Sequence, residues 1–320
     1  EVIIVIGANP TENHPVAATF FKNAAKKGSR LIVMDPRGHA LKKHATHMLQ
    51  FKPGSDVALL NSIMNVIIEE NLFNEEYIKK QTLGFLELKK HLMNYPPELM
   101  EEQTGISADM IREVARLFAN TDKGLIFWGM GVSQHVHGTD NARCLISLAL
   151  MTGNVGRRGS GLHPLRGQNN VQGASDAGLI PMMYPDYQLV EKDEKKDFFE
   201  KFWNTSLDDK KGLTVVEIMD AIHENTIKGM YILGENPAMS DPDLNHAREA
   251  LQMLDHLVVQ DIFLTETATY ADVIFPASAW PEKNGTVTNT NRQVQMGRKA
   301  LNAPGNAKED WWITNELGKR

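Results

Sequence analysis

The chain has 320 residues, of which 42% are hydrophobic and 23% are charged, and this suits one large or two ordinary globular domains. Its net charge of −6 excludes the global basic surface that nucleic-acid binding requires. No apolar run approaches the ~18 residues that a membrane span needs. We therefore expect no membrane span in this chain and a cytoplasmic location, and we leave export of a longer form open.

The first part of the chain alternates short apolar runs with turn residues. The predicted elements are a strand at 2–6, a Gly-Ala-Asn-Pro corner at 7–10, a helix to about 27, and strands at 31–34 and 47–51. The second strand ends directly at Asp35, and Ser55 or Asp56 can cap a helix after the third strand.

A long helical stretch is predicted from about 55 to 120, and Ser107 caps its last helix, which has a helical apolar stripe. This helix leads into another strand at 124–129. The sequence that follows, GMGVSQHVHGTDN, predicts a ligand loop, because glycines and polar side chains gather there at a strand's carboxyl end. His135 and His137 are a weak metal signal without a third ligand nearby, so we predict no metal site here.

Cys144 is the single cysteine of the chain and lies in DNARCLISLALM, on the apolar face of a predicted helix. We expect a buried core residue. One cysteine cannot build a disulfide framework, a zinc cluster or an iron–sulfur site.

Residues 152–176 read TGNVGRRGSGLHPLRGQNNVQGASD and combine many glycines with three consecutive amide side chains. This composition argues against a regular helix or strand, and we predict a loop packed against a polar ligand rather than a linker. Arg157, Arg158 and Arg166 form the local cluster of positive charge, and arginine forks match phosphate or carboxylate.

The second half repeats the plan of the first. Its predicted elements are a strand at 230–233, a Gly-Glu-Asn-Pro corner at 234–237, a helix to about 254, and strands at 257–260 and 272–276. Gly7 precedes Asp35 by 28 positions, and Gly234 precedes Asp261 by 27. We predict an α/β fold with two Rossmann-like αβα domains, whose parallel sheets are covered on both faces and related by pseudo-symmetry. Two generic α/β units are the alternative.

The corner residues favour a nucleotide-like ligand. Glycine permits close backbone approach, and turn N–H groups at a helix N-terminus attract an anion such as pyrophosphate. The Asp at the end of the next strand is where such folds hold a ribose or base. Neither half contains G-x-G-x-x-G, which argues against an ordinary NAD site. Two such halves suggest two nucleotides, or one ligand with two nucleotide arms.

Several motifs together point to a known family. GxNP, DPR, KPGSD, GMGVSQHVHG, RGQNNVQGASD, GENP, DIFLTET and EKNGTVTNTNRQVQ occur in this order. With them the whole chain resembles the catalytic subunits of molybdenum or tungsten formate dehydrogenases, in the molybdopterin oxidoreductase superfamily. RGQNNVQG is the element most typical of formate dehydrogenases, whereas the GxNP and TET elements are shared more widely.

The resemblance implies that each α/β domain binds one of two molybdopterin guanine dinucleotides on a single metal. For the first dinucleotide it implies Gly7, Asn9, Asp35, Arg37, Pro53, Gly54 and Asp56, with Gly129, Gly131, Gln134 and Gln168 on the cofactor as well. For the second it implies Gly234, Glu235, Asn236, Asp261, Thr265 and Thr267. Arg166 matches the active-site arginine that faces the substrate. The implied reaction is formate oxidation to carbon dioxide or its reverse, with iron–sulfur subunits or domains as electron-transfer partners.

The chain also departs from the family pattern. The family's N-terminal 4Fe-4S cluster region, its cysteine or selenocysteine metal ligand and its C-terminal β-barrel have no counterpart here. Since the chain also opens on Glu1 without methionine, we interpret it as the middle of a catalytic subunit and expect it to be inactive alone. The expected domains are 1–168 and 169–281, with a segment 282–320 that would return toward the iron–sulfur region and lack a partner here.

Other functions remain open from the sequence. A nitrate reductase or the large subunit of a respiratory NADH dehydrogenase belongs to the same superfamily. A thiamine diphosphate enzyme also has a central α/β domain, but it requires a G-D-G…N motif and the chain contains no GDG. A non-catalytic nucleotide-binding module is the alternative from another class.

Overall fold

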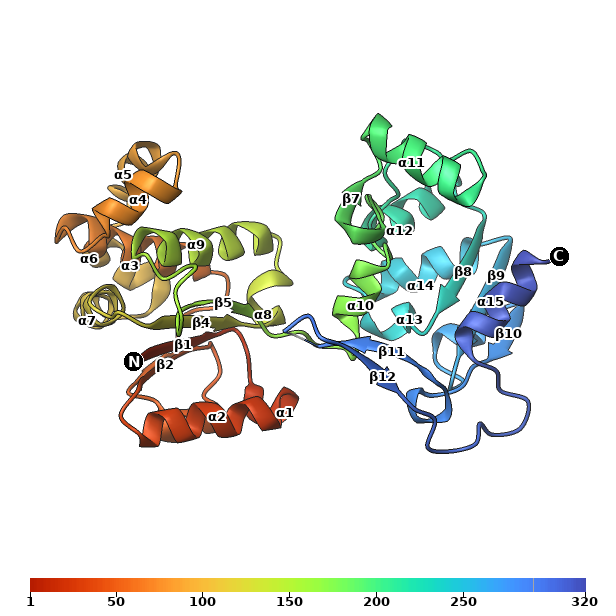
Figure 1. Ribbon diagram of the computed structural model, residues 1–320, viewed down its shortest axis with the longest axis horizontal. Helices are drawn as coiled ribbons and strands as arrows, with labels where there is room; N and C mark the ends of the chain where they lie inside the picture. Colours follow the sequence, from red (N-terminus) through yellow and green to blue (C-terminus); the bar gives the residue numbers. More distant parts are fainter. Residues whose placement is uncertain (290) are drawn as a thin grey trace. The chain divides into compact units, whose positions relative to one another are not determined.

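The structure is a computed structural model that describes residues 1–289 and 291–320. The chain divides into two compact units, Glu1–Gly167 and Gln168–Arg320. Each unit contains its own parallel sheet, visible in Figure 1 with the first unit in red to yellow-green and the second in green to blue.

The first unit is built on a five-stranded parallel sheet. Its strands are β1 (Val2–Ile6), β2 (Arg30–Met34), β3 (His47–Leu49), β4 (Gly124–Trp128) and β5 (Gly161–Pro164). Their order across the sheet is β3-β2-β1-β4-β5, with every neighbouring pair parallel. All five strands therefore end at one carboxyl edge, which is where open α/β sheets bind ligands.

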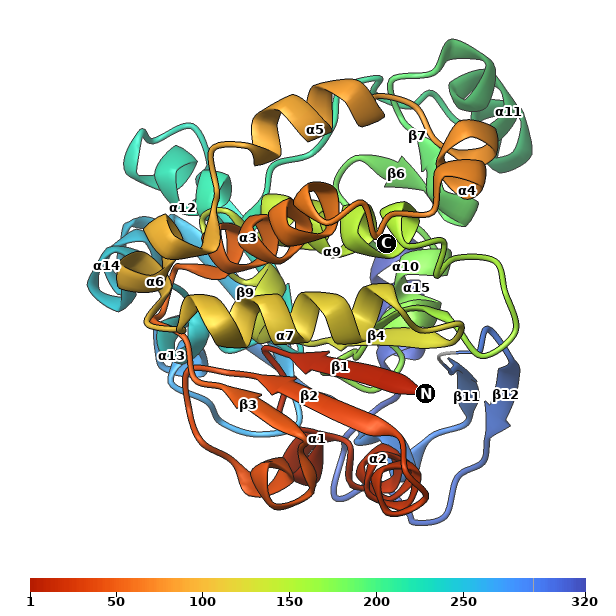
Figure 2. The same cartoon turned by 90° about the vertical axis from the view of Figure 1, so that its left-hand side faces the viewer.

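Helices lie on both faces of this first sheet, as predicted. Figure 2 shows α3 (Asp56–Glu69), α7 (Ala108–Ala119) and α9 (Gly138–Met151) on one side of it and α2 (Pro15–Lys26) on the other. Along β1, Val2, Ile4 and Ile6 join the larger core cluster, and Ile3 and Val5 join the smaller one. A strand buried on both faces explains why VIIVI shows no alternation with polar residues.

The predicted helical stretch from 55 to 120 consists of five separate helices. Between α3 and α7 the chain forms α4 (Glu75–Gln81), α5 (Phe85–Leu92) and α6 (Pro97–Thr104). Ser55 occupies the N-cap position of α3, but its hydroxyl donates to the Lys52 carbonyl at 2.6 Å instead of accepting from the helix. Ser107 caps α7 as predicted, because its Oγ accepts from Met110 N–H at 3.4 Å.

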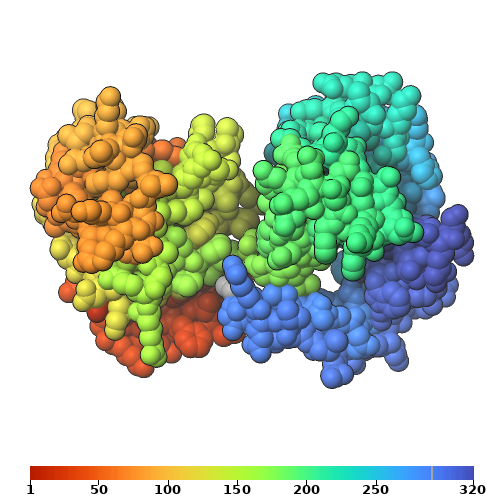
Figure 3. All heavy atoms as spheres, turned by 45° about the horizontal axis from the view of Figure 1, so that its top comes forward, coloured from red at the N-terminus to blue at the C-terminus, as the bar shows by residue number. Residues whose placement is uncertain are grey.

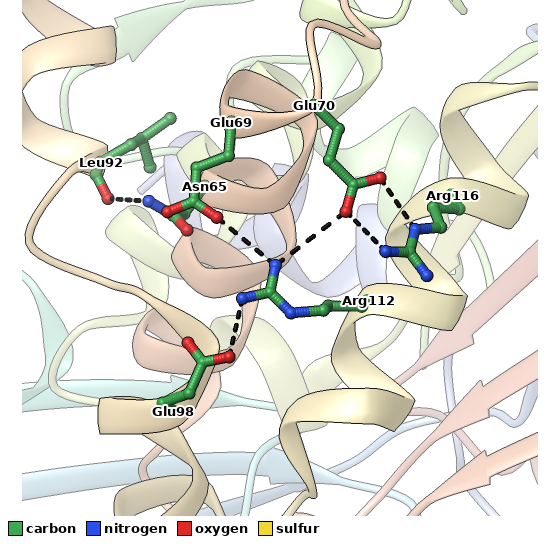
Figure 4. Close-up of polar contacts among 7 residues, drawn as sticks. All are labelled: Asn65, Glu69, Glu70, Leu92, Glu98, Arg112 and Arg116. Atoms are coloured by element: carbon green, nitrogen blue, oxygen red, sulfur yellow. Dashed lines mark hydrogen bonds and ion pairs between the residues drawn. The ribbon is translucent and has the colours of Figure 1, made fainter.

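Charged side chains connect α3, α6 and α7 on the outside of the unit (Figure 4). Arg112 donates to Glu98 at 2.7 Å and to Glu69 at 3.4 Å, and Arg116 donates to both oxygens of Glu70 at 2.8 and 2.7 Å. Hydrogen bonds from Arg116 lower the pKa of Glu70. Ion pairs at a solvent-exposed surface contribute little to stability, so buried apolar packing remains its main source.

The second unit has a smaller parallel sheet with the order β10-β9-β8. Its strands are β8 (Gly229–Leu233), β9 (His256–Asp261) and β10 (Val273–Pro276). Ile232, Leu257 and Val259 lie in one core cluster on the face covered by α14 (Leu244–Met253). On the other face, Tyr231 is 40% exposed and Leu233 is 46% exposed. The expectation of complete cover on both faces therefore holds for the first sheet only.

The remaining elements of the second unit precede and follow this sheet. They are α10 (Val171–Asp176), β6 (Met183–Tyr184), η2 (Pro185–Tyr187), β7 (Gln188–Leu189), α11 (Asp193–Trp203), α12 (Val215–His223), η3 (Thr267–Tyr270), η4 (Trp280–Glu282), β11 (Gly285–Thr288), β12 (Val294–Gly297) and α15 (Asp310–Gly318). In Figure 3 the green segment that contains α11 lies at the surface of its unit.

Two sequence predictions about irregular segments were wrong. Residues 152–176 contain a strand and a helix, because β5 pairs with β4 in the first sheet and α10 follows the RGQNN turn. The segment after 282 does have partners within its own unit. Asn170 donates to the Thr286 carbonyl at 3.2 Å and accepts from Thr288 N–H at 2.9 Å. Thr290 of the EKNGTVTNTNRQVQ motif lies outside the described residues.

Candidate functional site at the carboxyl edges of the two sheets

The two G-x-N-P corners have the same local geometry. Gly7 and Gly234 follow the central and the edge strand of their sheets with φ of +55° and +66°. Asn9 and Asn236 then occupy helix N-cap positions with φ, ψ of −112°, 75° and −124°, 64°. A left-handed φ strains any residue with a Cβ, which explains the glycine in both corners.

The backbone register after each corner also repeats. Gly7 N–H donates to the Met34 carbonyl at 3.0 Å, and Gly234 N–H donates to the Gln260 carbonyl at 2.9 Å. Each acceptor is the residue directly before the strand-end aspartate, Asp35 in one unit and Asp261 in the other. The predicted correspondence of Gly7 with Gly234 and of Asp35 with Asp261 is confirmed.

The predicted helix after each corner is two helices. The corner opens a single turn, α1 (Pro10–Asn13) or α13 (Pro237–Ser240). The longer helix α2 begins at a second proline, Pro15, and α14 begins two residues after Pro242. Pro15 and Pro242 cause this break, because proline removes a backbone donor and crowds the preceding turn. The dipole of a long helix is therefore not directed at either corner, and anion binding there needs other groups.

The two corners differ in how closely other parts of the chain pack against their glycines. A Cβ on Gly7 would lie 2.7 Å from Val132 N, and one on Gly131 would lie 2.6 Å from the Gly7 carbonyl oxygen. Gly131 N–H donates to that same carbonyl at 3.0 Å, within the turn α8 (Met130–Ser133). A Cβ on Gly234 meets nothing within 4 Å. The first corner is thus packed by the chain's own GMG segment, whereas the second is open.

The other predicted residues of the first unit lie at the same sheet edge. Asp35 and Arg37 follow β2; Pro53, Gly54 and Asp56 lead from β3 into α3; Gly129 and Gln134 follow β4; and Arg166 follows β5. Gln168 belongs to the second unit and is exposed.

Asp35 and Asp56 are both buried at this edge. Burial raises the pKa of Asp56, and the charge of Asp35 acts in the same direction, whereas its own backbone N–H and His135 oppose the shift. Asp35 accepts a hydrogen bond from Arg37 N–H at 2.8 Å. Asp35, Asp56 and His135 come from three separate segments near this edge, and the sequence had suggested His135 only as a weak metal signal.

A pocket of about 740 Å³ lies beside this edge, between α1 and the segment after β2. Its lining residues are Asn9, Glu12, Arg37, Gly38, His39, Ala40, Lys42 and Lys43. Burial lowers the pKa of His39. Asn9 and Arg37 were predicted from the sequence as cofactor-binding residues, and the other side chains of the pocket were not. The Lys42-Lys43 pair follows a strand end closely in the sequence and could have indicated an anion site there.

At the edge of the second sheet, the predicted residues bond to one another. Asn236 Oδ1 accepts from Thr267 Oγ1 at 2.8 Å, and Asn236 Nδ2 donates to Glu266 at 2.7 Å. Thr267 is fully buried and also accepts from Ala238 N–H at 3.1 Å, so it holds the corner in place. Gly234 and Glu235 are exposed, and Thr265 is half-buried.

A buried polar group beside Asp261 was missed from the sequence. Gln260 is fully buried, and its Nε2 donates to Asp310 at 2.8 Å, which fixes α15 to β9. Lys283 also bonds to Asp310, and Tyr231 OH donates to Gln260. These residues come from four separate segments of the chain, so no short sequence motif predicts that they meet.

Cys144 is buried, as predicted, and its Sγ lies 3.5 Å from Asn61 Oδ1. Burial raises the pKa of the thiol to about 11. Because the thiolate is the reactive form, we expect the native chain to react with a disulfide reagent at pH 8 at least about 100-fold more slowly than the unfolded chain. Similar labelling rates in the two states would contradict this expectation.

Among the described residues, no three His, Cys, Asp or Glu side chains converge to hold a metal ion. Within that same part of the chain, no helix is both long enough and apolar enough to cross a membrane.

A family model described as molybdopterin oxidoreductase matches residues 1–320. The chain belongs to the molybdopterin oxidoreductase family. Membership implies a molybdopterin cofactor that carries molybdenum or tungsten. The side chains at the first edge fit such a phosphorylated heterocycle, because Arg37, Lys42 and Lys43 supply positive charge around a pocket.

Relatives within the molybdopterin oxidoreductase family include several formate dehydrogenases. The chain is 48% identical over 320 residues to a formate dehydrogenase alpha subunit of Methanocaldococcus jannaschii and spans 47% of it. It is 40% identical over 321 residues to formate dehydrogenase H of Escherichia coli, spanning 45% of that protein. The assimilatory nitrate reductase catalytic subunit of Bacillus subtilis is 37% identical over 318 residues. The chain thus spans just under half the length of these relatives.

The fold also agrees with that of a solved structure. Acetylene hydratase from Pelobacter acetylenicus matches 99% of this chain and is itself covered to 46%, with a TM-score of 0.79 and 23% identity. At this identity the likeness concerns the fold alone, a mixed α/β architecture with two parallel sheets.

Proposed function

We propose that this chain is the part of a formate dehydrogenase catalytic subunit that binds two molybdopterin guanine dinucleotides, one at each sheet edge. The observation that carries the proposal is the placement of Arg166, in the RGQNN segment directly after β5. Formate dehydrogenase relatives at 40–48% identity support the same substrate. The metal–pterin group would supply the two-electron oxidation of formate to carbon dioxide, and iron–sulfur centres elsewhere in the assembly would pass the electrons on.

The residues of this chain would bind and orient the two dinucleotides and the formate. Arg37 and the two lysines beside it provide charge for phosphate groups, and Asp35 and Asp56 provide acceptors for ribose or base donors. In the second unit, Gly234 leaves open space where backbone can approach a ligand. Arg166 would hold the formate carboxylate by charge-assisted hydrogen bonds.

A nitrate reductase is the second candidate, favoured by the 37% identity to the assimilatory enzyme's catalytic subunit. Either enzyme would have to bind a small anion, formate or nitrate, so the fold alone does not distinguish the two functions. Relative turnover of formate and nitrate by the holoenzyme does separate them.

Composition analysis of the purified holoenzyme tests the cofactor half of the proposal. We expect two guanine nucleotides for each molybdenum or tungsten after acid hydrolysis, because each sheet edge would take one dinucleotide. One guanine nucleotide per metal, or none, would show that only one edge or neither edge is a dinucleotide site.

A further inference from the structure

A hydrogen bond links the first corner to the segment that carries Arg166. His14 Nε2 lies 2.5 Å from the Arg166 carbonyl oxygen, although 152 positions separate the two residues in the sequence. His14 ends α1 and precedes α2. Its N–H donates to the Pro10 carbonyl at 3.0 Å, and its carbonyl accepts from Ala18 N–H at 2.9 Å. Both main-chain groups of His14 are therefore hydrogen-bonded, and this fixes the backbone that carries the imidazole.

The chemistry of this contact defines the state of the ring. A carbonyl oxygen only accepts hydrogen bonds, so His14 Nε2 carries the proton. Nδ1 then keeps its lone pair; it is shielded from solvent and has no hydrogen-bond partner among the described residues. The contact requires a proton on Nε2, whereas a proton on the buried Nδ1 would lack an acceptor among the described residues.

The main chain leaves the first sheet just before Arg166, since β5 ends at Pro164. Leu165 N–H donates to the Trp128 carbonyl at 2.7 Å, at the end of β5. Across positions 166–169, no backbone–backbone hydrogen bond joins residues that the structure describes. The His14 side chain thus holds the main chain close to the point where it leaves the sheet.

We propose that His14 is a positioning residue, whose Nε2–H fixes the carbonyl of Arg166 and so aims the guanidinium on the same residue. That His14 fixes the main chain at Arg166 follows from the contact itself. That this contact aims the guanidinium at a substrate rests on the proposed function of Arg166. A site must hold its binding groups within a fraction of an ångström, so one hydrogen bond to the backbone of such a group affects how well it binds.

Two amide variants test the main-chain part by hydrogen exchange and NMR. Glutamine places an N–H near the position of imidazole Nε2, and asparagine is too short to reach it. We expect His14→Asn to speed amide exchange at Leu165 about tenfold, as loss of one hydrogen bond predicts, and His14→Gln to stay close to the native rate. Ile4, in the buried centre of β1, reports global stability in the same spectra, and His91→Asn on α5 is the matched control.

Three results bear on the proposal. Equal exchange at Leu165 in the asparagine and glutamine variants would overturn it, as would imidazole ¹⁵N shifts that place the proton on Nδ1. In the complete enzyme, we expect His14→Asn to raise the KM for formate about tenfold with little change in kcat, and His14→Gln to restore it. Faster exchange without a change in KM would confirm the main-chain role and instead refute the substrate role of Arg166.

Discussion

Replacing Arg166 with alanine is expected to lower kcat/KM for formate by at least about 100-fold in the complete enzyme. Formate offers one recognition group, its carboxylate, and an arginine can bind it with two parallel N–H bonds. Removing one partner of a buried charge pair costs roughly 2–5 kcal/mol. Arg166 is half-buried at the carboxyl edge of the first sheet, and the next positively charged residue after it in the sequence is Lys192.

A lysine variant and a composition assay complete this test. Arg166→Lys should recover only part of the activity, because lysine keeps the charge but lacks the planar fork. Pterin and metal content should remain native in both variants, since Arg166 is assigned to the substrate. If Arg166→Ala lost its cofactor together with its activity, the residue would be a cofactor anchor and the proposed role would be wrong.

Substituting alanine for Gly7 is expected to destabilise the first unit by about 2–5 kcal/mol. A φ of +55° strains an L residue by about 1–2 kcal/mol. The added Cβ would also lie 2.7 Å from Val132 N and 2.8 Å from the Gly131 carbonyl carbon. Backbone atoms cannot move aside as a flexible side chain can, and overpacking of this kind costs about 1–3 kcal/mol more.

The repeated corner supplies the matched control. Gly234→Ala carries the same left-handed strain, with a φ of +66°, but its Cβ meets nothing within 4 Å. It should cost the second unit only about 1–2 kcal/mol. Native-state hydrogen exchange at Ile4 and at Ile232 measures the two units separately, because each residue is buried in a strand of its own unit's sheet. Equal losses at the two corners would show that the contact with the GMG segment is not tight.

Much of the fold follows from local pattern. VIIVI and its neighbours are apolar without alternation, and this is typical of strands covered on both faces. The spacing of Gly7 to Asp35 and of Gly234 to Asp261 was sufficient to predict the repeat, because a strand–corner–helix–strand unit has nearly fixed length. The burial of Cys144 also followed from its place on a helical apolar face.

The sequence by itself determined the α/β class, the two corners and the family, since these depend on short-range periodicity and on motifs that lie together in the chain. Only the tertiary structure decided that Gly7 is packed against Gly131, that residues 161–164 join a sheet despite their glycine-rich setting, and that His14 meets the carbonyl of Arg166. The physical reason is the same for all three. Each of the three is a contact between segments that are far apart in the sequence. Pairing and close packing with a distant segment can outweigh local backbone preference, and a short sequence motif does not show which distant segment will be the neighbour.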